Sequence, residues 1–155
     1  RNCADLKEAN SEEFDEKSNS SEDHLIYHLS KWIKDQKVEI RSKVQNKGGT
    51  MRLGAYPAKI KKGTLAYSIY KKTIVSERHR HRFEVNVNYQ EALEDNGLTF
   101  SGFSQDGSLP EVVELSSHPF FLGVQFHPEL KSKPFEPHPI FSAFIKKALE
   151  QTRLV

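Results

Sequence analysis

The chain has 155 residues, of which 36% are hydrophobic, so it can bury one core and is expected to form a single domain over residues 1–155. Its 23 Lys and Arg residues against 21 Asp and Glu leave a formal net charge of +2, too balanced for a protein that mainly neutralises nucleic-acid phosphates. No apolar run reaches the roughly 20 residues of a membrane-spanning helix, and the polar start has no signal-peptide core, so we expect a soluble chain.

The N-terminal part of the chain is acidic and polar. It begins at Arg1 without an initiator methionine or a capping signal, so we expect this end to be a truncation. Cys3 is the single cysteine and cannot form an internal disulfide, which favours a reducing, cytoplasmic location. Residues 7–23 are rich in carboxylates and serines and nearly lack large apolar side chains, so a loop or a partly mobile arm is expected there.

Strands are predicted where residues are β-branched or where apolar and polar residues alternate. The apolar segment 25–33 could be of either type, and the pair Gly48-Gly49 indicates a turn within a mobile loop between Arg41 and Arg52. The predicted strands are residues 37–43, a segment beginning at 51–54, residues 73–76 continuing into the basic stretch, and residues 98–103, 112–115 and 120–126. The last three are expected to be neighbours in one sheet.

Helices are predicted from capping residues and from apolar spacing. Thr64 can cap a short helix that ends at Tyr70, and Asn96-Gly97 is a usual stop for a helix over residues 89–96. Apolar residues of 140–149 recur at the spacing of one helix face, so an amphipathic helix is expected to cover the sheet. The sequence therefore predicts a mixed α/β unit.

The strongest chemical signal is Gln125-Phe126-His127-Pro128-Glu129, which follows an apolar run. In a strand, His127 and Glu129 would share a face, and a carboxylate on the second ring nitrogen fixes the tautomer of an imidazole that acts as a general base. Pro128 ends the hydrogen-bonding ladder and turns the chain outward. The alternative is that His-Pro only ends a strand and that Glu129 is solvated.

The second signal is the run Arg78-His79-Arg80-His81-Arg82. In an extended strand the three arginines point to one face and the two histidines to the other, and an arginine at the end could grip a substrate carboxylate through two hydrogen bonds. Competing interpretations are a phosphate or nucleic-acid patch, a histidine pair for a metal ion, and a plain solvated basic strand. The metal interpretation lacks a cysteine or a nearby carboxylate cluster for the remaining ligands.

Five segments, spread between residues 9 and 129, carry a resemblance to a known family that extends over nearly all 155 residues. They are Ala9-Asn10-Ser11-Glu12-Glu13-Phe14, Gly48-Gly49-Thr50-Met51-Arg52-Leu53-Gly54, Glu77-Arg78-His79-Arg80-His81-Arg82-Phe83-Glu84-Val85-Asn86, His118-Pro119-Phe120-Phe121 and Val124-Gln125-Phe126-His127-Pro128-Glu129. With these segments in this order, the chain resembles the C-terminal glutamine amidotransferase domain of the CTP synthases, a class I (triad) glutaminase.

The resemblance implies a fold and a set of site residues. The fold is the α/β class I glutamine amidotransferase type, a flavodoxin-like open sheet with helices, of which the chain would hold the C-terminal portion as a partial domain. His127 and Glu129 would be the catalytic base and its orienting acid. Arg82 would bind the α-carboxylate of L-glutamine and Glu13 its α-amino group. Arg41 would anchor an effector loop through which GTP promotes glutamine hydrolysis, and no metal site is implied.

The resemblance also implies partners. Ammonia from glutamine would pass to the synthetase domain of the same parent chain, where ATP and Mg²⁺ support amination of UTP to CTP. The fragment itself would hold no cofactor, nucleic acid and membranes are not expected as partners, and the parent would be a homotetramer. The family's nucleophilic cysteine lies at a Gly-flanked elbow that these residues do not contain, so Cys3 is expected to be an incidental thiol and the fragment alone inactive.

Two rival functions stay open at this point. One is a nucleotide- or phosphate-binding module derived from the glutaminase fold, in which the arginine strand binds phosphate without catalysis. The other is a degenerate interaction domain that has lost its nucleophile.

Overall fold

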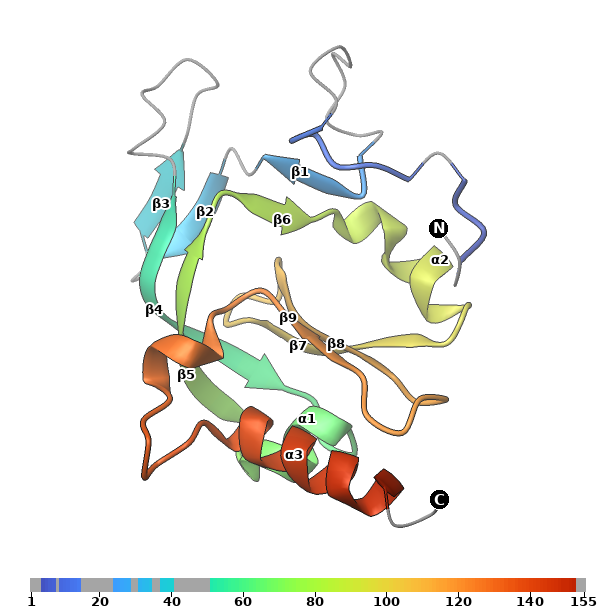
Figure 1. Ribbon diagram of the computed structural model, residues 1–155. Helices are drawn as coiled ribbons and strands as arrows, with labels where there is room; N and C mark the ends of the chain where they lie inside the picture. The colour runs from blue at the N-terminus through green and yellow to red at the C-terminus, as the bar shows by residue number, and fades with distance from the viewer. Residues whose placement is uncertain are drawn as a thin grey trace.

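A five-stranded antiparallel sheet dominates the computed structural model, which describes residues 4–7, 9–14, 24–28, 31–34, 37–40 and 51–152 (Figure 1). Its strands, in spatial order, are β5 (Ile74–His81), β4 (Arg52–Ile60), β7 (Leu98–Ser104), β8 (Pro110–Leu115) and β9 (Leu122–Val124). Each neighbouring pair in this order runs antiparallel. Residues 98–103, 112–115 and 120–126 therefore contribute adjacent strands, as predicted, although the last strand already ends at Val124.

Two short ribbons complete the strands of the described residues. Strand β1 (Ile26–His28) pairs antiparallel with β6 (Phe83–Val85), and β2 (Lys31–Lys34) pairs with β3 (Lys37–Ile40). The segment 25–33, for which the sequence favoured neither helix nor strand, thus contributes to the strands β1 and β2. In the view of Figure 1 the β1–β6 ribbon lies above the five-stranded sheet, and the β5–β6 bend joins the two.

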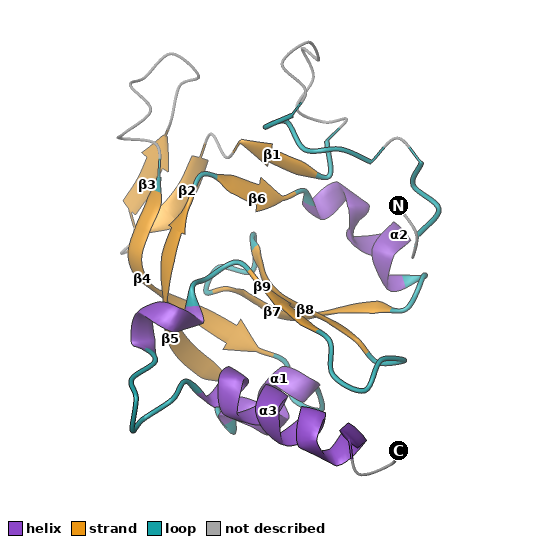
Figure 2. Ribbon diagram, viewed as in Figure 1, coloured by secondary structure: helices purple, strands orange, loops and turns teal. Residues whose placement is uncertain are grey.

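The helices are short except for the last one (Figure 2). They are α1 (Leu65–Tyr70), α2 (Gln90–Glu94), α3 (Pro139–Thr152) and the 3-10 turns η3 (Val87–Tyr89) and η4 (Pro128–Lys131). Thr64 caps α1 as predicted, because its hydroxyl accepts a hydrogen bond from the Tyr67 amide at 3.2 Å. None of the described helices is long and apolar enough to cross a bilayer.

The main core lies between the five-stranded sheet and the helices α1 and α3. Its buried members come from the sheet, from both helices and from the segment after β9: Ala58, Ile60, Ala66, Val75, Val112, Phe126 and Ile140. Alternation along β4 places Ala58 and Ile60 on the buried face and Lys59 outside, as a strand with one solvated face requires.

Helix α3 forms where the sequence predicts it but covers the sheet less than expected. It packs beside α1, and Ile140 in its first turn is its buried residue. Further along the same helix, the side chains of Phe144, Ile145 and Leu149 are 51%, 56% and 56% exposed. Apolar spacing predicted the helix correctly, but it does not say which surface a helix meets.

Candidate active site

His127 and Glu129 meet at the turn that follows β9. The amide of His127 donates to the carbonyl oxygen of Arg78 at 2.8 Å, which attaches this turn to β5. The ring Nδ1 of His127 lies 2.7 Å from Oε1 of Glu129. The structure therefore brings together the two residues that the sequence singles out, and Glu129 is not merely solvated.

The reason for this proximity differs from the one expected. The strand has ended at Val124, so side-chain alternation along a strand does not align the pair. Instead, Pro128 starts η4, with His127 as the residue before it, and the tight 3-10 turn folds Glu129 back onto the imidazole.

The electrostatics of the turn keep Glu129 ionised. The hydrogen bond from His127 lowers the pKa of Glu129 below its ordinary value, and the positive charge of Arg80 adds to the effect. A carboxylate bonded to Nδ1 holds the proton there and leaves Nε2 as the nitrogen that can exchange protons with a substrate. The side chains of His127 and Glu129 are 37% and 58% exposed, so the pair is accessible.

Glu77 holds the segment after the turn against β5. Its buried carboxylate accepts hydrogen bonds from the Tyr70 hydroxyl at 3.0 Å and from Nε2 of His138 at 3.1 Å, and it pairs with Lys131 at 3.3 Å. Burial alone would raise the pKa of Glu77, but the hydrogen bond and charge of His138 and the charge of Lys131 lower it below the usual range. Both ends of the segment 131–138 are thereby fixed beside the dyad.

The basic run alternates as predicted along β5. Arg78 and Arg80 are exposed, whereas His79 is buried. Arg82 lies beyond the strand end, at the bend before β6, and is partly buried. Burial, together with the charge of Arg52, lowers the pKa of His79 to about 2, so this ring is neutral. The described residues contain no cluster of three or more His, Cys, Asp or Glu that could hold a metal ion.

Glu13 is exposed on a turn that is attached to the β1–β6 ribbon. Ser11 bridges to Ile26 of β1, and the Glu12 amide donates to the carbonyl oxygen of Ile26 at 2.9 Å. Because β1 pairs with β6, which begins directly after Arg82, the loop of Glu13 and the bend of Arg82 belong to the same small ribbon. Two further residues singled out from the sequence, Arg41 and Cys3, lie outside the described residues.

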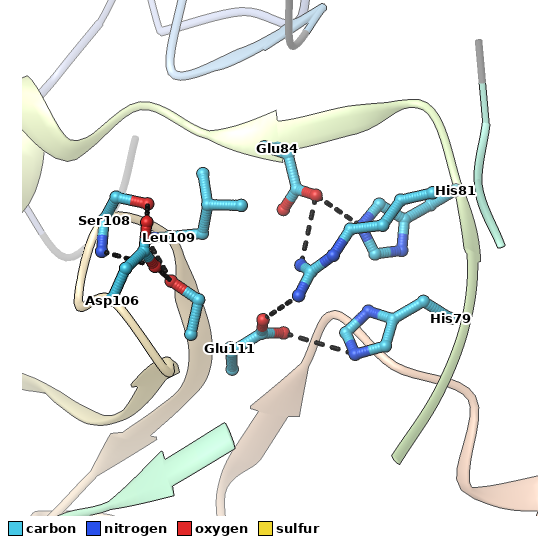
Figure 3. A network of polar contacts seen from close by, with 9 residues as sticks. His79, His81, Glu84, Asp106, Ser108, Leu109 and Glu111 are labelled. Carbon is cyan, nitrogen blue, oxygen red and sulfur yellow. Dashed lines mark hydrogen bonds and ion pairs between the residues drawn. The ribbon is translucent and has the colours of Figure 1, made fainter. Parts of the chain in front are cut away.

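A buried network of charged side chains lies beneath these elements and was missed by the sequence analysis (Figure 3). Arg52 reaches Glu84 at 3.3 Å through Nη1 and contacts Glu111 through Nη2. His81 lies 2.7 Å from the same oxygen of Glu84, and Nε2 of His79 lies 3.6 Å from Glu111. One signal was present in the sequence: Arg52 has the same parity as the inward residues of β4, which places it on the buried face.

Comparison with known proteins shows the family of the chain. The family model described as glutamine amidotransferase class-I matches residues 15–147. A CTP synthase of Cereibacter sphaeroides is 56% identical over 156 residues, and one of Zymomonas mobilis is 55% identical over 155 residues. Each alignment covers 100% of this chain but 28% of the relative, so the chain spans 28% of the length of these relatives.

Two solved structures are similar to the chain. The glutaminase domain of Trypanosoma brucei CTPS with bound acivicin has a TM-score of 0.76 and 37% identity, over 97% of this chain and 54% of that one. A putative GMP synthase protein from Thermoplasma acidophilum has a TM-score of 0.51 and 17% identity, over 67% of this chain and 47% of that one, and shares the fold. The predicted α/β fold class is thus confirmed, and the match of the family model over residues 15–147 shows that the chain belongs to the class-I glutamine amidotransferase family.

Proposed function

We propose that this chain is part of a CTP synthase and that it takes part in glutamine hydrolysis, which supplies ammonia for the ATP-dependent amination of UTP to CTP. The observation that carries the proposal is the hydrogen-bonded pair of His127 and Glu129, 2.7 Å apart, at the accessible turn after β9. Identity above 50% to CTP synthases over the whole chain supports the choice of this enzyme within the family.

The chemistry assigned to the pair is proton transfer during amide cleavage. A cysteine thiol outside these 155 residues loses its proton to Nε2 of His127 and attacks the side-chain amide carbon of glutamine. His127 then gives the proton to the departing nitrogen, so that the carbon–nitrogen bond breaks, ammonia leaves and a thioester forms. Water activated by His127 hydrolyses the thioester to glutamate. Glu129 steadies the imidazolium whenever the ring carries both protons.

Recognition of the amino acid is assigned to two charged residues on the β1–β6 side. In this proposal the Arg82 guanidinium binds the α-carboxylate through two parallel hydrogen bonds, and the carboxylate of Glu13 binds the α-ammonium group. The attachment of both residues to one ribbon supports their joint use. Arg41 is proposed to belong to the loop through which GTP promotes hydrolysis.

The remaining partners belong to the longer protein. We place the binding of ATP, Mg²⁺ and UTP in a synthetase domain outside these residues, assign the protein to the cytoplasm, and expect it to assemble as a homotetramer. The support for these points is the similarity to CTP synthases, of which the chain spans 28%.

The test separates glutamine use from ammonia use in the full-length protein. His127→Ala and Glu129→Ala should each lower kcat for glutamine-dependent CTP formation, by about 10²–10⁴-fold for His127, because proton transfer to the leaving nitrogen is lost. CTP formation from added ammonium chloride should stay unchanged. Glu136→Ala is a matched control, because Glu136 is an exposed carboxylate that pairs with Lys133 outside the proposed machinery. Unchanged glutamine-dependent rates in the His127 variant would refute the proposal and favour a phosphate-binding module.

A further inference from the structure

We propose that Arg52, His81 and Glu84 form a buried clamp that sets the position of Arg82 and thereby the affinity of the domain for the α-carboxylate of glutamine. The inference rests on the proposed function, in which Arg82 binds that carboxylate. It adds three positioning residues, none of which touches the substrate.

The clamp closes around the bend that carries Arg82. Strand β5 ends at His81 and β6 begins at Phe83, so Arg82 is the single residue between the two strands. Nε2 of His81 and Oε1 of Glu84 lie 2.7 Å apart, which joins the residues on either side of the bend by a direct hydrogen bond (Figure 3). The backbone of Arg82 therefore lies within a loop of four residues that is closed by side chains.

Arg52 ties this closed bend to the main sheet. It is paired with His81 in the ladder between β4 and β5, and its Nη1 reaches Oε1 of Glu84, the oxygen that His81 also contacts. Its Nη2 contacts Glu111 on β8, and its guanidinium lies 4.6 Å from the ring centre of Tyr56. The guanidinium is thus held from several directions and cannot move without breaking buried contacts.

Burial of the clamp residues restricts the bend to one arrangement. The side chains of Arg52 and Glu84 are 3% and 1% exposed, and an unpaired charge at such depth would be strongly destabilising. Apolar residues could fill the same space at similar or better stability, but they would not fix one arrangement of the bend. Charge-assisted hydrogen bonds in a dry environment are short and directional, so they restrict where Arg82 can lie.

The clamp also bears on Glu13, the residue proposed to bind the α-ammonium group. The amide of His28 donates to the carboxylate of Glu12 at 2.6 Å, and His28 pairs with Phe83 at the start of β6. A shift of the bend would therefore move the turn of Glu13 together with Arg82.

The test uses the full-length protein and compares KM with kcat for glutamine. Glu84→Met, which removes the clamp, should raise KM about tenfold with kcat changed less than about threefold, because binding geometry is lost while the dyad stays intact. Glu84→Gln keeps one acceptor oxygen and should give a smaller rise. Glu114→Met is the matched control: Glu114 is also a buried carboxylate of the sheet, but it caps α1 through the Leu65 amide, so KM should not change.

A double-mutant cycle distinguishes positioning from general structural damage. In an Arg82→Ala background, Glu84→Met should raise KM no further, whereas a purely structural role would act equally in both backgrounds. An unchanged KM in the folded single variant, or the same rise on top of Arg82→Ala, would overturn the clamp. If Glu84→Met does not fold, His81→Leu provides the same comparison at a partly exposed position. If Arg82→Ala itself leaves KM unchanged, the proposed role of Arg82 in glutamine binding fails. Failure of the clamp alone and failure of the proposed function therefore give different results.

Discussion

Glu111 is the buried group whose ionisation has the clearest consequence for stability. Its side chain is fully buried, and it shares the Arg52 guanidinium with Glu84. Burial raises the pKa of Glu111 from the usual 4.5 to about 7, the negative charges of Glu84 and Asp106 act in the same direction, and contact with Arg52 opposes them. Between pH 4.5 and 7 the folded chain therefore binds more protons at this position than the unfolded chain.

The contribution of Glu111 to the free energy of unfolding should consequently fall as the pH rises from about 4.5 to about 7, by roughly 3 kcal/mol at most. Glu111→Gln removes the titration, so its free energy of unfolding should lack this decline. Urea unfolding of the chain at pH 5 and pH 7.5 measures the difference between variant and wild type. Comparison with wild type is needed because His79, whose pKa is lowered from 6.5 to about 2, makes a contribution of the opposite sign in the same pH range, and Glu77, whose pKa is also lowered, does so at lower pH. The same pH dependence in both proteins would contradict the assignment.

At the scale of the elements, β7 depends on a residue without a side chain. Its pairing with β8 shifts register on both sides of Gly102, which is buried in the middle of the strand. A Cβ atom at this position would lie 2.7 Å from Cγ2 of Val112 and 3.1 Å from Cδ1 of Ile60. Both neighbours belong to the main core, where little movement is possible.

Gly102→Ala should therefore destabilise the chain by about 1–3 kcal/mol, through overpacking of the core. Val112→Ala makes room for the new methyl group, so the double variant should lose less stability than the sum of the two single variants. Denaturant midpoints of the four proteins in this cycle give the coupling energy. Additive losses would show that the contact with Val112 is not the cause.

For the whole molecule, the proposed site is assembled from three places in the chain. The dyad lies on the turn after β9, Arg82 on the β5–β6 bend, and Glu13 on the loop attached to β1. The hydrogen bond from the His127 amide to Arg78 attaches the dyad to β5, the strand that ends next to Arg82, but no Gly-flanked cysteine occurs in the 155 residues. Apolar side chains at the end of α3 are also exposed, which leaves a surface that other protein segments could cover.

The 155-residue chain by itself should accordingly release no glutamate from glutamine above the uncatalysed rate, because it lacks the nucleophilic cysteine that His127 would deprotonate. The measurement is a coupled glutamate assay on the chain, with the full-length protein as the active reference and a Cys3→Ser variant alongside. Turnover that survives Cys3→Ser would contradict the assigned roles. Turnover that this substitution abolishes would identify Cys3 as the nucleophile.

The sequence predicts the features that depend on contacts between residues close together in the chain. Thr64 and Tyr67 are three residues apart, and His127 and Glu129 are two apart, so the cap of α1 and the dyad could be read from local spacing. The alternation of exposed arginines and buried histidine along β5 is likewise local. The turn geometry of the dyad differs from the sequence-based expectation, because Pro128 is the first residue of a 3-10 turn and not the end of a strand.

The sequence by itself determined the α/β class, most strands and helices, and the spacing of His127 and Glu129, since these depend on neighbours along the chain. Only the tertiary structure decided that Arg52 meets Glu84 and Glu111, which are 32 and 59 residues away, and that Glu77 meets His138, 61 residues away. A charged residue in a strand looks the same in sequence whether it is solvated or buried. Its partner, and with it the free energy of burial, is set by the pairing of distant strands.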